Sequence, residues 1–310
     1  MNRREFLKWS VFSLVGALIV SSLGKRMAWP ELPPQKKTVP PKSPPRMSVV
    51  TGGTPQQRVE AAIAALGGIS RFIRPGSRVV VKPNIAWSRT PQEAANTDPE
   101  VVAAVVGLCR QAGARRVVVL DHTCSNYLMS YRQSGIEAAA KQAGAEVLPA
   151  DQIKYYRQVN IPEAKILRSP MILNEVLDCD VLINLPVVKV HGSTMVTLSM
   201  KNLMGVVWDR GMMHSTDLHQ TIVDLSLAVK PKLILLDATR ILTSNGPTGP
   251  GNVRTLNQLI ATTDPVTADA YGAKMLGFDP EKVPHIRFAH QMGLGEIDIQ
   301  PLRVKNVKLA

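Results

Sequence analysis

The chain has 310 residues and a formal net charge of +13, and 45% of its residues are hydrophobic, which is enough to bury a sizeable core. Aromatic residues make up only 5% of the chain, so little material is available for stacking on bases, and nucleic-acid binding is not expected. Residues 1–46 carry nine of the 37 Lys and Arg but only two of the 24 Asp and Glu. The remainder, residues 47–310, is therefore only mildly basic.

The N-terminus begins M-N-R-R-E-F-L-K, and an uncharged apolar run over residues 9–23 follows. The paired Arg3 and Arg4 ahead of this run resemble the twin-arginine (Tat) export signal, whose pattern is R-R-x-F-L-K. The resemblance implies passage through the twin-arginine export machinery and an extracytoplasmic location, in the periplasm or on the outer face of the cytoplasmic membrane. The small-x-small sequence at residues 22–24 could be a cleavage site. Without cleavage, residues 9–23 could tether the chain to the membrane.

Residues 30–46 contain seven prolines and three lysines. Because proline fixes φ and removes a backbone donor, this segment is expected to be an extended linker, with an arm packed on the domain as the alternative. The sequence therefore divides into a signal helix or membrane anchor at residues 1–29, a Pro-rich linker at residues 30–46 and one α/β domain at residues 47–310.

Strand and helix patterns alternate within the domain. Continuous apolar runs indicate strands that are buried on both faces, as in a parallel sheet, and amphipathic segments between them indicate helices. The fold class is therefore α/β, with a mostly parallel sheet flanked by helices. The predicted strands are residues 78–82, 116–121, 145–148, 180–185, 232–237 and 258–263, and the predicted helices are residues 58–66, 99–112, 135–142, 170–177, 217–229 and 266–276.

Polar residues stand at the carboxyl ends of most predicted strands, which is where open α/β sheets bind ligands. The acidic residues among them have an alternative role as N-caps of the next helix, which is the expected role of Asp264. The candidates after the strands are Lys82, Asn84, Asp121, His122, Lys189, His191 and Asp237.

Residues 196–202 alternate between apolar and polar side chains. If this segment is a strand, Thr197, Ser199 and Lys201 point to one face and present two hydroxyls and an ammonium in a row. The alternative is a half-exposed strand with a solvated polar face.

A cationic cluster of Lys82, Lys189 and Lys201 would suit a carboxylate or phosphate group, and three separate solvated lysines are the alternative. We expect Lys189, His191 and Lys201 to contact the ligand, and His191 or His214 to move a proton. A divalent metal would be held by Asp121, His122 and Asp237. The remaining cofactor-binding candidates are Lys82, Asn84, Thr197, Ser199, Asn202, Gly246 and Gly249.

The two glycines belong to the glycine–proline loop at residues 245–251, whose backbone amides could cradle an anion, with a plain surface turn as the alternative. The three cysteines of the chain share no C-x-x-C spacing, and an iron–sulfur cluster held by this chain alone, which needs about four cysteines, is not expected. Cys109 and Cys179 lie in apolar contexts and are expected to be buried thiols.

Several of these pieces also carry a family resemblance. Val81-Lys82-Pro83-Asn84, residues 97–102, residues 180–186, Lys189-Val190-His191, residues 196–205 and Asp264-Pro265 resemble, in order, the family catalogued as domain of unknown function 362. Some members of that family carry ferredoxin-like cysteine motifs, which this chain lacks. A weaker likeness is to the lactate-racemase (nickel-pincer) family. It implies that Asp121-His122 and Lys189 with His191 could hold a cofactor and carry protons.

Two classes of function follow. The first is an exported enzyme-like domain, racemase-like or oxidoreductase-like, that binds a small anionic ligand or cofactor, with a divalent metal as a candidate. The second is a non-catalytic extracytoplasmic binding or assembly partner of a redox complex, which predicts a large apolar surface patch and no closed polar pocket.

Overall fold

A computed structural model describes residues 46–298 and 304–310 of the chain. The predicted signal, the candidate membrane tether and almost all of the predicted linker lie outside the described residues. Within residues 46–298 and 304–310, no helix is both long enough and apolar enough to cross a bilayer.

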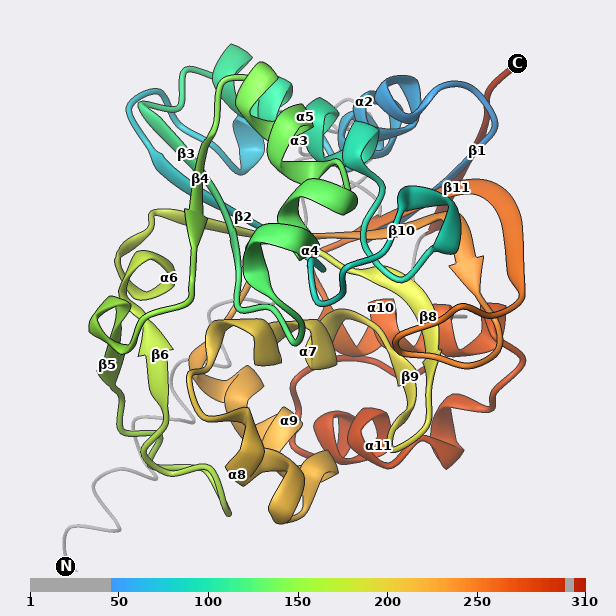
Figure 1. Cartoon of the computed structure of the whole chain (residues 1–310). Coiled ribbons are helices and arrows are strands. Elements are labelled where there is room, and N and C mark those ends of the chain that lie inside the picture. The colour runs from blue at the N-terminus through green and yellow to red at the C-terminus, as the bar shows by residue number, and fades with distance from the viewer. Residues whose placement is uncertain (1–45, 299–303) are drawn as a thin grey trace, which may run out of the picture. The chain divides into compact units, whose positions relative to one another are not determined.

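The fold is built on a mixed, mostly parallel sheet whose strands run in the order β12–β1–β11–β10–β7–β2–β3–β4 (Figure 1). From β10 to β4 the neighbouring strands are parallel, whereas β11 is antiparallel to both β10 and β1. The strands of this path are β1 (Met47–Thr51), β2 (Arg78–Pro83), β3 (Arg116–Asp121), β4 (Glu146–Pro149), β7 (Val181–Leu185), β10 (Leu233–Leu242), β11 (Val253–Thr262) and β12 (Val304–Lys308).

Two further strand pairs complete the sheet structure. β8 (Val187–His191) pairs with β10 and with β9 (Met195–Thr197), and β5 (Tyr156–Gln158) pairs with β6 (Met171–Leu173) as a separate two-stranded sheet.

Helices cover both faces of the main sheet, and each face has its own apolar core. Alternation along the buried strands divides their side chains, because Val79 and Val81 of β2 pack into one core and Val80 into the other. The core that contains Val79 and Val81 is covered by α2 (Pro55–Ala65), α3 (Pro99–Gln111) and α5 (Ile136–Gln142). The core that contains Val80 is covered by α7 (Ser199–Asn202), α9 (Leu218–Ala228), α10 (Pro265–Met275) and α11 (Pro284–Gln291) (Figure 1). The shorter helices are α4 (Tyr127–Gln133), α6 (Asn174–Asp178) and α8 (Arg210–Ser215).

Two α-helices, α3 and α10, begin at an Asp-Pro pair. The Asp98 side chain accepts a hydrogen bond from the Glu100 amide at the start of α3, and the Asp264 side chain accepts one from Thr267 at the start of α10. Proline follows each aspartate, where a missing N–H costs nothing. The N-cap role expected of Asp264 is confirmed.

The connectivity reverses between β2 and β7. The chain runs from β2 outward to β3 and β4, and then returns to the opposite side of β2 to form β7 and later β10. In a parallel sheet this reversal separates the loops that leave the two strands, which opens a crevice at their carboxyl ends. The fold therefore places a ligand crevice where Lys82 and Asn84 follow β2.

Two element predictions were wrong. Residues 170–177 form β6 and the short α6 rather than one helix. The strand predicted at residues 258–263 is present as the second half of β11, which begins earlier, at Val253. The alternating segment 196–202 is a strand only to Thr197, after which the backbone turns into α7. The cause of this turn is Asp269 of α10, whose carboxylate accepts hydrogen bonds from the amides of Ser199 (2.5 Å) and Met200 (3.1 Å).

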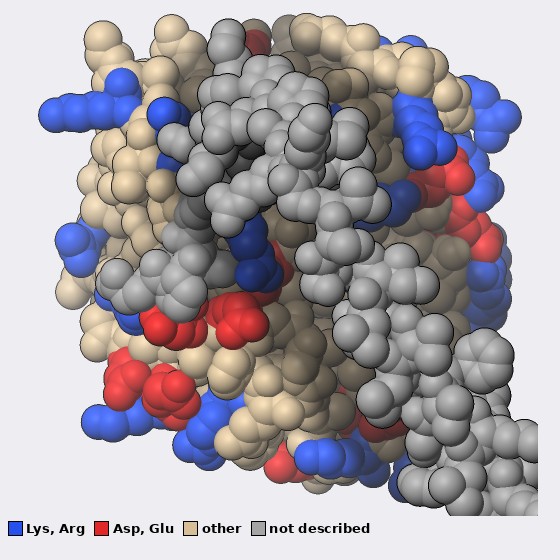
Figure 2. Space-filling model, turned by 180° about the vertical axis from the view of Figure 1, so that it is seen from behind, with Lys and Arg blue, Asp and Glu red and all other residues tan. Residues whose placement is uncertain are grey.

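The charges of the domain are dispersed, as its composition indicates. Figure 2 shows Lys and Arg side chains interspersed with Asp and Glu on the described part of one face. A group of basic side chains, Lys82, Lys189, Lys201 and Arg210, lines one cavity inside the crevice.

Candidate functional site

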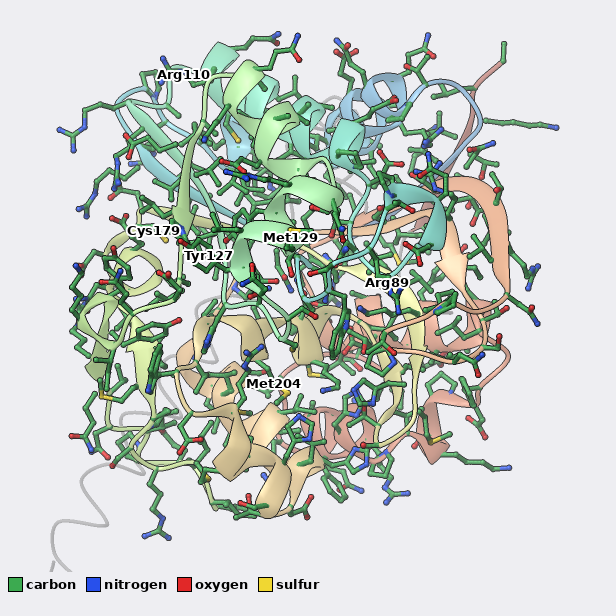
Figure 3. The ribbon with its side chains drawn as sticks, in the orientation of Figure 1. Arg89, Arg110, Tyr127, Met129, Cys179 and Met204 are labelled. Carbon is green, nitrogen blue, oxygen red and sulfur yellow. The ribbon has the colours of Figure 1, made fainter. Side chains whose placement is uncertain are left out.

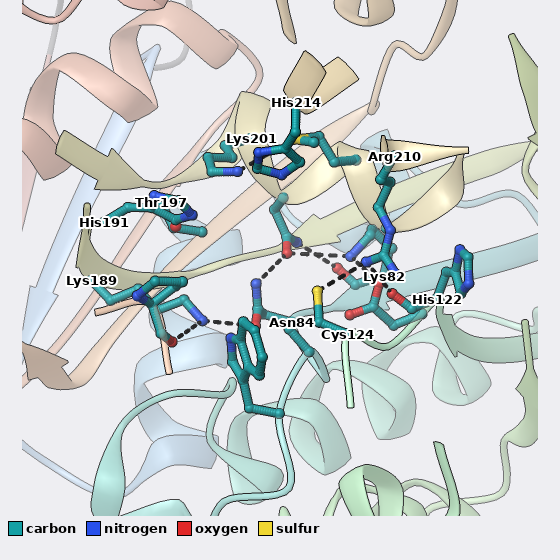
Figure 4. Close-up of a pocket in the computed structure, with 17 residues that line it drawn as sticks. Lys82, Asn84, His122, Cys124, Lys189, His191, Thr197, Lys201, Arg210 and His214 are labelled. Carbon is teal, nitrogen blue, oxygen red and sulfur yellow. Dashed lines mark hydrogen bonds and ion pairs between the residues drawn. The ribbon is translucent and has the colours of Figure 1, made fainter. Parts of the chain in front are cut away.

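A partly open cavity of about 290 Å³ lies at the carboxyl ends of β2, β3 and β8, and residues of α7 and α8 line its other side. Its volume is near the lower end of the range for ligand sites. Figure 4 shows side chains from these elements around one space. The cavity is lined by Lys82, Asn84, Ala86, Trp87, Asp121, His122, Cys124, Lys189, His191, Thr197, Lys201, Asn202, Met204, Gly205, Arg210, His214 and Pro247.

Lys82 and Asp121 form a fully buried ion pair at the base of the cavity, with 2.7 Å between Nζ and Oδ1. Burial lowers the pKa of Lys82, and the Asp121 charge opposes this shift. The Lys82 ammonium also donates to the Pro83 carbonyl and to Asn202 Oδ1, and Asn84 donates to the same Asn202 oxygen. These side chains are therefore held by one another and form a fixed base for the cavity.

Lys189 is buried and contacts no carboxylate among the residues that the structure describes. Its ammonium donates to Asn84 Oδ1 at 3.2 Å, to the Ala95 carbonyl at 2.5 Å and to the Pro247 carbonyl at 3.2 Å. Burial lowers its pKa to about 7, and the charge of Lys201 acts in the same direction. Lys189 can therefore gain and lose a proton near neutral pH, as a general acid or base requires.

Lys201 reaches the cavity from α7 and is 7% exposed. Within the described residues its ammonium contacts only the Met204 sulfur, at 3.3 Å, and burial lowers its pKa to about 8. The Thr197 hydroxyl on the same cavity wall is buried and has no hydrogen-bond partner in the described part of the chain. Buried polar groups without partners are costly, so this wall is suited to a ligand that accepts hydrogen bonds.

The pKa values of the three histidines that line the cavity, His122, His191 and His214, are all lowered, which favours the neutral imidazole at pH 7. Burial, together with the charges of Lys201 and Lys189, lowers the pKa of His191 to about 3, and its Nδ1 accepts a hydrogen bond from the Ser193 amide at 3.0 Å. Burial also lowers the pKa of His122 and of the more exposed His214. The expectation that His191 titrates near neutral pH is not supported, and Lys189 fits that role better.

The metal-binding set predicted from the sequence is not brought together. β7 and β2 lie between β10, which carries Asp237, and β3, which carries Asp121. Three strand spacings separate the two by about 14 Å, which is too far for one ion. Asp237 instead accepts hydrogen bonds from the Asp98 and Thr239 amides, and His122 bonds the Val207 carbonyl and stacks on Trp208. No group of three His, Cys, Asp or Glu suited to a metal occurs within residues 46–298 and 304–310.

Three predicted cofactor-binding residues lie away from the cavity lining. Ser199 is fully buried, and its hydroxyl bonds Asn184. Gly246 packs so closely on β8 that an added Cβ would lie 2.0 Å from the Val190 carbonyl oxygen. The loop turns carbonyls toward cations, because Pro247 and Gly249 accept hydrogen bonds from Lys189 and Arg89, respectively. In these contacts the loop at residues 245–251 therefore provides carbonyl acceptors for cations, and not the backbone amides that were predicted to bind an anion.

Sequence reasoning did not select two polar residues that line the cavity, Cys124 and Arg210. Arg210 donates to the His122 carbonyl at 2.8 Å, to the Thr123 carbonyl at 2.6 Å and to the Cys124 sulfur at 3.1 Å. The available signal was the position of Cys124, three residues beyond the end of β3 on the ligand-binding edge. Figure 3 shows Cys179 well to one side of Met204, which lines the cavity.

Comparison of the sequence with known protein families finds a match over most of the domain. Residues 79–274 match the family described as "Domain of unknown function (DUF362)". The chain is 27% identical to the thylakoid-associated protein sll1697 of Synechocystis sp. over 248 residues, which cover 74% of this chain and 72% of that protein.

A solved structure also matches part of the chain. The lactate racemase apoprotein from Thermoanaerobacterium thermosaccharolyticum aligns with a TM-score of 0.45 and 11% sequence identity. The match covers 76% of this chain and 58% of that one, which is less than two thirds of its length.

Proposed function

The chain belongs to the DUF362 family, as its sequence indicates, and because that designation assigns no activity we propose a function from the geometry of the cavity. The protein is an enzyme-like α/β domain that binds a small anion, a carboxylate or phosphate group. Lys201 and Thr197 bind the anion, and Lys189 takes up and releases a proton.

The observation that carries this proposal is the buried Lys201 ammonium, which faces the cavity and contacts no oxygen atom in the described part of the chain. A desolvated ammonium without an acceptor is unfavourable, and an anionic oxygen supplies that acceptor. The Thr197 hydroxyl can donate to the same ligand.

The charge balance of the cavity also favours an anion. Lys82, Lys189, Lys201 and Arg210 line it, and Asp121 is the one acidic side chain in that lining. Because Asp121 is paired with Lys82, up to three positive charges remain for a ligand at a pH where both remaining lysines are protonated. A cavity lined by one sign of charge concentrates ligands of the opposite sign.

The proton-transfer part of the proposal rests on Lys189. Its three acceptors are neutral oxygens, which fix the amine at the cavity wall without the stabilisation that a carboxylate would give its charged form. A bound anion would raise the pKa of Lys189, so the amine would take up a proton as the ligand binds.

The second hypothesis, a non-catalytic assembly partner, predicts no closed polar pocket. A partly open cavity lined by four basic side chains, among them Lys189 and Lys201 with lowered pKa values, favours the first hypothesis instead. Export through the twin-arginine machinery remains part of the proposal, and a folded domain with a preformed cavity is the kind of passenger that this machinery carries.

The test is a Lys201→Met variant compared with Lys165→Met, a matched change at an exposed lysine. Inorganic phosphate, acetate, pyruvate and malonate are titrated into each protein by calorimetry, and the melting temperature is followed in parallel. A ligand at 100 times its Kd stabilises the folded protein by about 2.7 kcal/mol. We expect Lys165→Met to keep this stabilisation and Lys201→Met to lose it. A folded Lys201→Met protein that binds every anion as the wild type does would contradict the proposal.

A further inference from the structure

Cys124 occupies an unusual position for a cysteine, because it is exposed at the edge of a cationic cavity. It lies in the loop after β3, and its amide donates to the Ala86 carbonyl at 2.8 Å, which ties this loop to the segment after β2. The sulfur accepts a hydrogen bond from Arg210 at 3.1 Å (Figure 4). The thiol is thus held in place and remains accessible.

Positive charge surrounds this sulfur. Besides Arg210, both Lys189 and Lys201 are electrostatically coupled to Cys124, since a negative charge on the sulfur raises the pKa of each lysine. These three cations attract negative charge to the part of the cavity that holds the sulfur, including the carboxylate of a ligand.

The other two cysteines lack this environment. Cys109 is buried in an apolar core, and burial raises its pKa to about 12. Burial raises the pKa of Cys179 to about 11, and its thiol donates to the Val176 carbonyl. Both are protonated at neutral pH and serve as internal references for Cys124.

An independent observation points to a ligand in the cavity that Cys124 lines. The unpartnered Thr197 hydroxyl is buried and lines the same cavity, together with the Lys201 ammonium that contacts no oxygen. These groups provide donors for an anion, while Cys124 provides an electron pair at the rim. A small molecule that carries both an anionic group and an electrophilic carbon could contact the donors and the sulfur at the same time.

We propose that Cys124 is a nucleophile of this cavity and that the cavity takes small carboxylates with an electrophilic carbon next to the carboxylate. This inference rests on the anion site proposed above. Lys201 and Thr197 bind the carboxylate, and the cationic wall directs the adjoining carbon toward the sulfur.

The covalent step can be written for iodoacetate, the simplest member of this class. The exposed thiol first loses its proton to water, and a sulfur electron pair then attacks the CH₂ carbon. The S–C bond forms as the C–I bond breaks, and iodide leaves with the bonding pair. The product is a carboxymethyl thioether, and no oxidant or reductant takes part.

The experiment compares iodoacetate with iodoacetamide, which has the same leaving group and reacting carbon but no charge. Full-length protein is labelled with each reagent at pH 7, and peptide mapping by mass spectrometry gives the rate at each cysteine. Each Cys124 rate is divided by the rate of N-acetylcysteine with the same reagent. The iodoacetate-to-iodoacetamide ratio of these normalised rates then isolates the effect of the cavity on the charged reagent.

We expect this ratio to be about ten or more at Cys124, since a field of one sign raises the reaction rate of an oppositely charged reagent by at least this factor. Cys109 and Cys179 should stay unlabelled, and Cys124→Ser should remove the label. Lys201→Met should bring the ratio toward one while the iodoacetamide rate changes little. Saturating inorganic phosphate should do the same to wild-type protein, which keeps the test valid if the variant fails to fold.

A ratio of about one or lower, or no labelling of Cys124 by either reagent, overturns the inference. If phosphate still binds in that case and Lys201→Met removes its binding, the anion site stands and only the role of Cys124 is lost. If phosphate binding is also absent, the proposed function fails as well.

Discussion

Gly205 is the residue that lets the buried Lys82–Asp121 pair form, and its replacement by alanine should break the base of the cavity. An added Cβ at this position would lie 1.8 Å from Asp121 Oδ1 and 2.8 Å from Lys82 Nζ. The backbone at Gly205 does not have a positive φ, so alanine would be excluded for lack of space rather than by conformation.

The cost follows from the contacts that hold Asp121. One carboxylate oxygen lies 2.7 Å from Lys82 Nζ, and the other accepts a hydrogen bond from the Ile85 amide at 2.6 Å. Clearing the new methyl group requires a shift of about 1 Å, which disturbs both contacts. Breaking a buried ion pair costs about 3–5 kcal/mol. For a domain of this size such a loss lowers Tm by roughly 10 °C.

The assay is urea unfolding of Gly205→Ala and of Gly107→Ala, followed by circular dichroism. Gly107 lies within α3, and an added Cβ there meets no atom within 4 Å. Alanine at this helical position should therefore stabilise the protein by about 0.5–1 kcal/mol. If Gly205→Ala unfolds within 1 kcal/mol of the wild type and still binds phosphate, the argument that Gly205 maintains the ion pair is refuted.

Three further outcomes are expected. Acetate keeps its single negative charge from pH 6 to 9, and its affinity, measured by calorimetry, should fall over this range because Lys189 with a pKa of about 7 and Lys201 with a pKa of about 8 lose their charges; an affinity that is flat across this range would contradict the assignment. Burial raises the pKa of Asp269 to about 8, so the folded state binds more protons than the unfolded chain between about pH 4 and 8. The unfolding free energy of the wild type minus that of Asp269→Asn should therefore decrease from pH 5 to 8, and an increase would refute the sign. Replacing Arg3 and Arg4 together by lysine keeps the charge but removes the twin-arginine pair, so the protein should remain in the cytoplasmic fraction; unchanged export would show that another signal directs it.

The sequence by itself determined the features that depend on neighbouring residues. The valine run of β2 and the similar run of β3 predicted buried parallel strands, because a continuous apolar segment requires cover on both faces. Asp264 before Pro265 marked the start of a helix. The rule that ligands bind at strand ends selected Lys82 and Lys189, and both line the cavity.

Only the tertiary structure decided which side chains at the strand ends lie next to one another. The segment after Thr197 alternates like a strand, yet it becomes helical. The reason is that the Ser199 amide donates a hydrogen bond to the carboxylate of Asp269, which lies 70 residues further along the chain. Strand order separates Asp237 from Asp121. The contact of α8 with the loop after β3 brings Cys124 beside Arg210, 86 residues further along the chain. Local patterns record which face of an element is buried, whereas the charges and partners that a side chain meets depend on contacts between distant segments. The anion binding proposed for the cavity and the reactivity proposed for Cys124 both depend on those contacts.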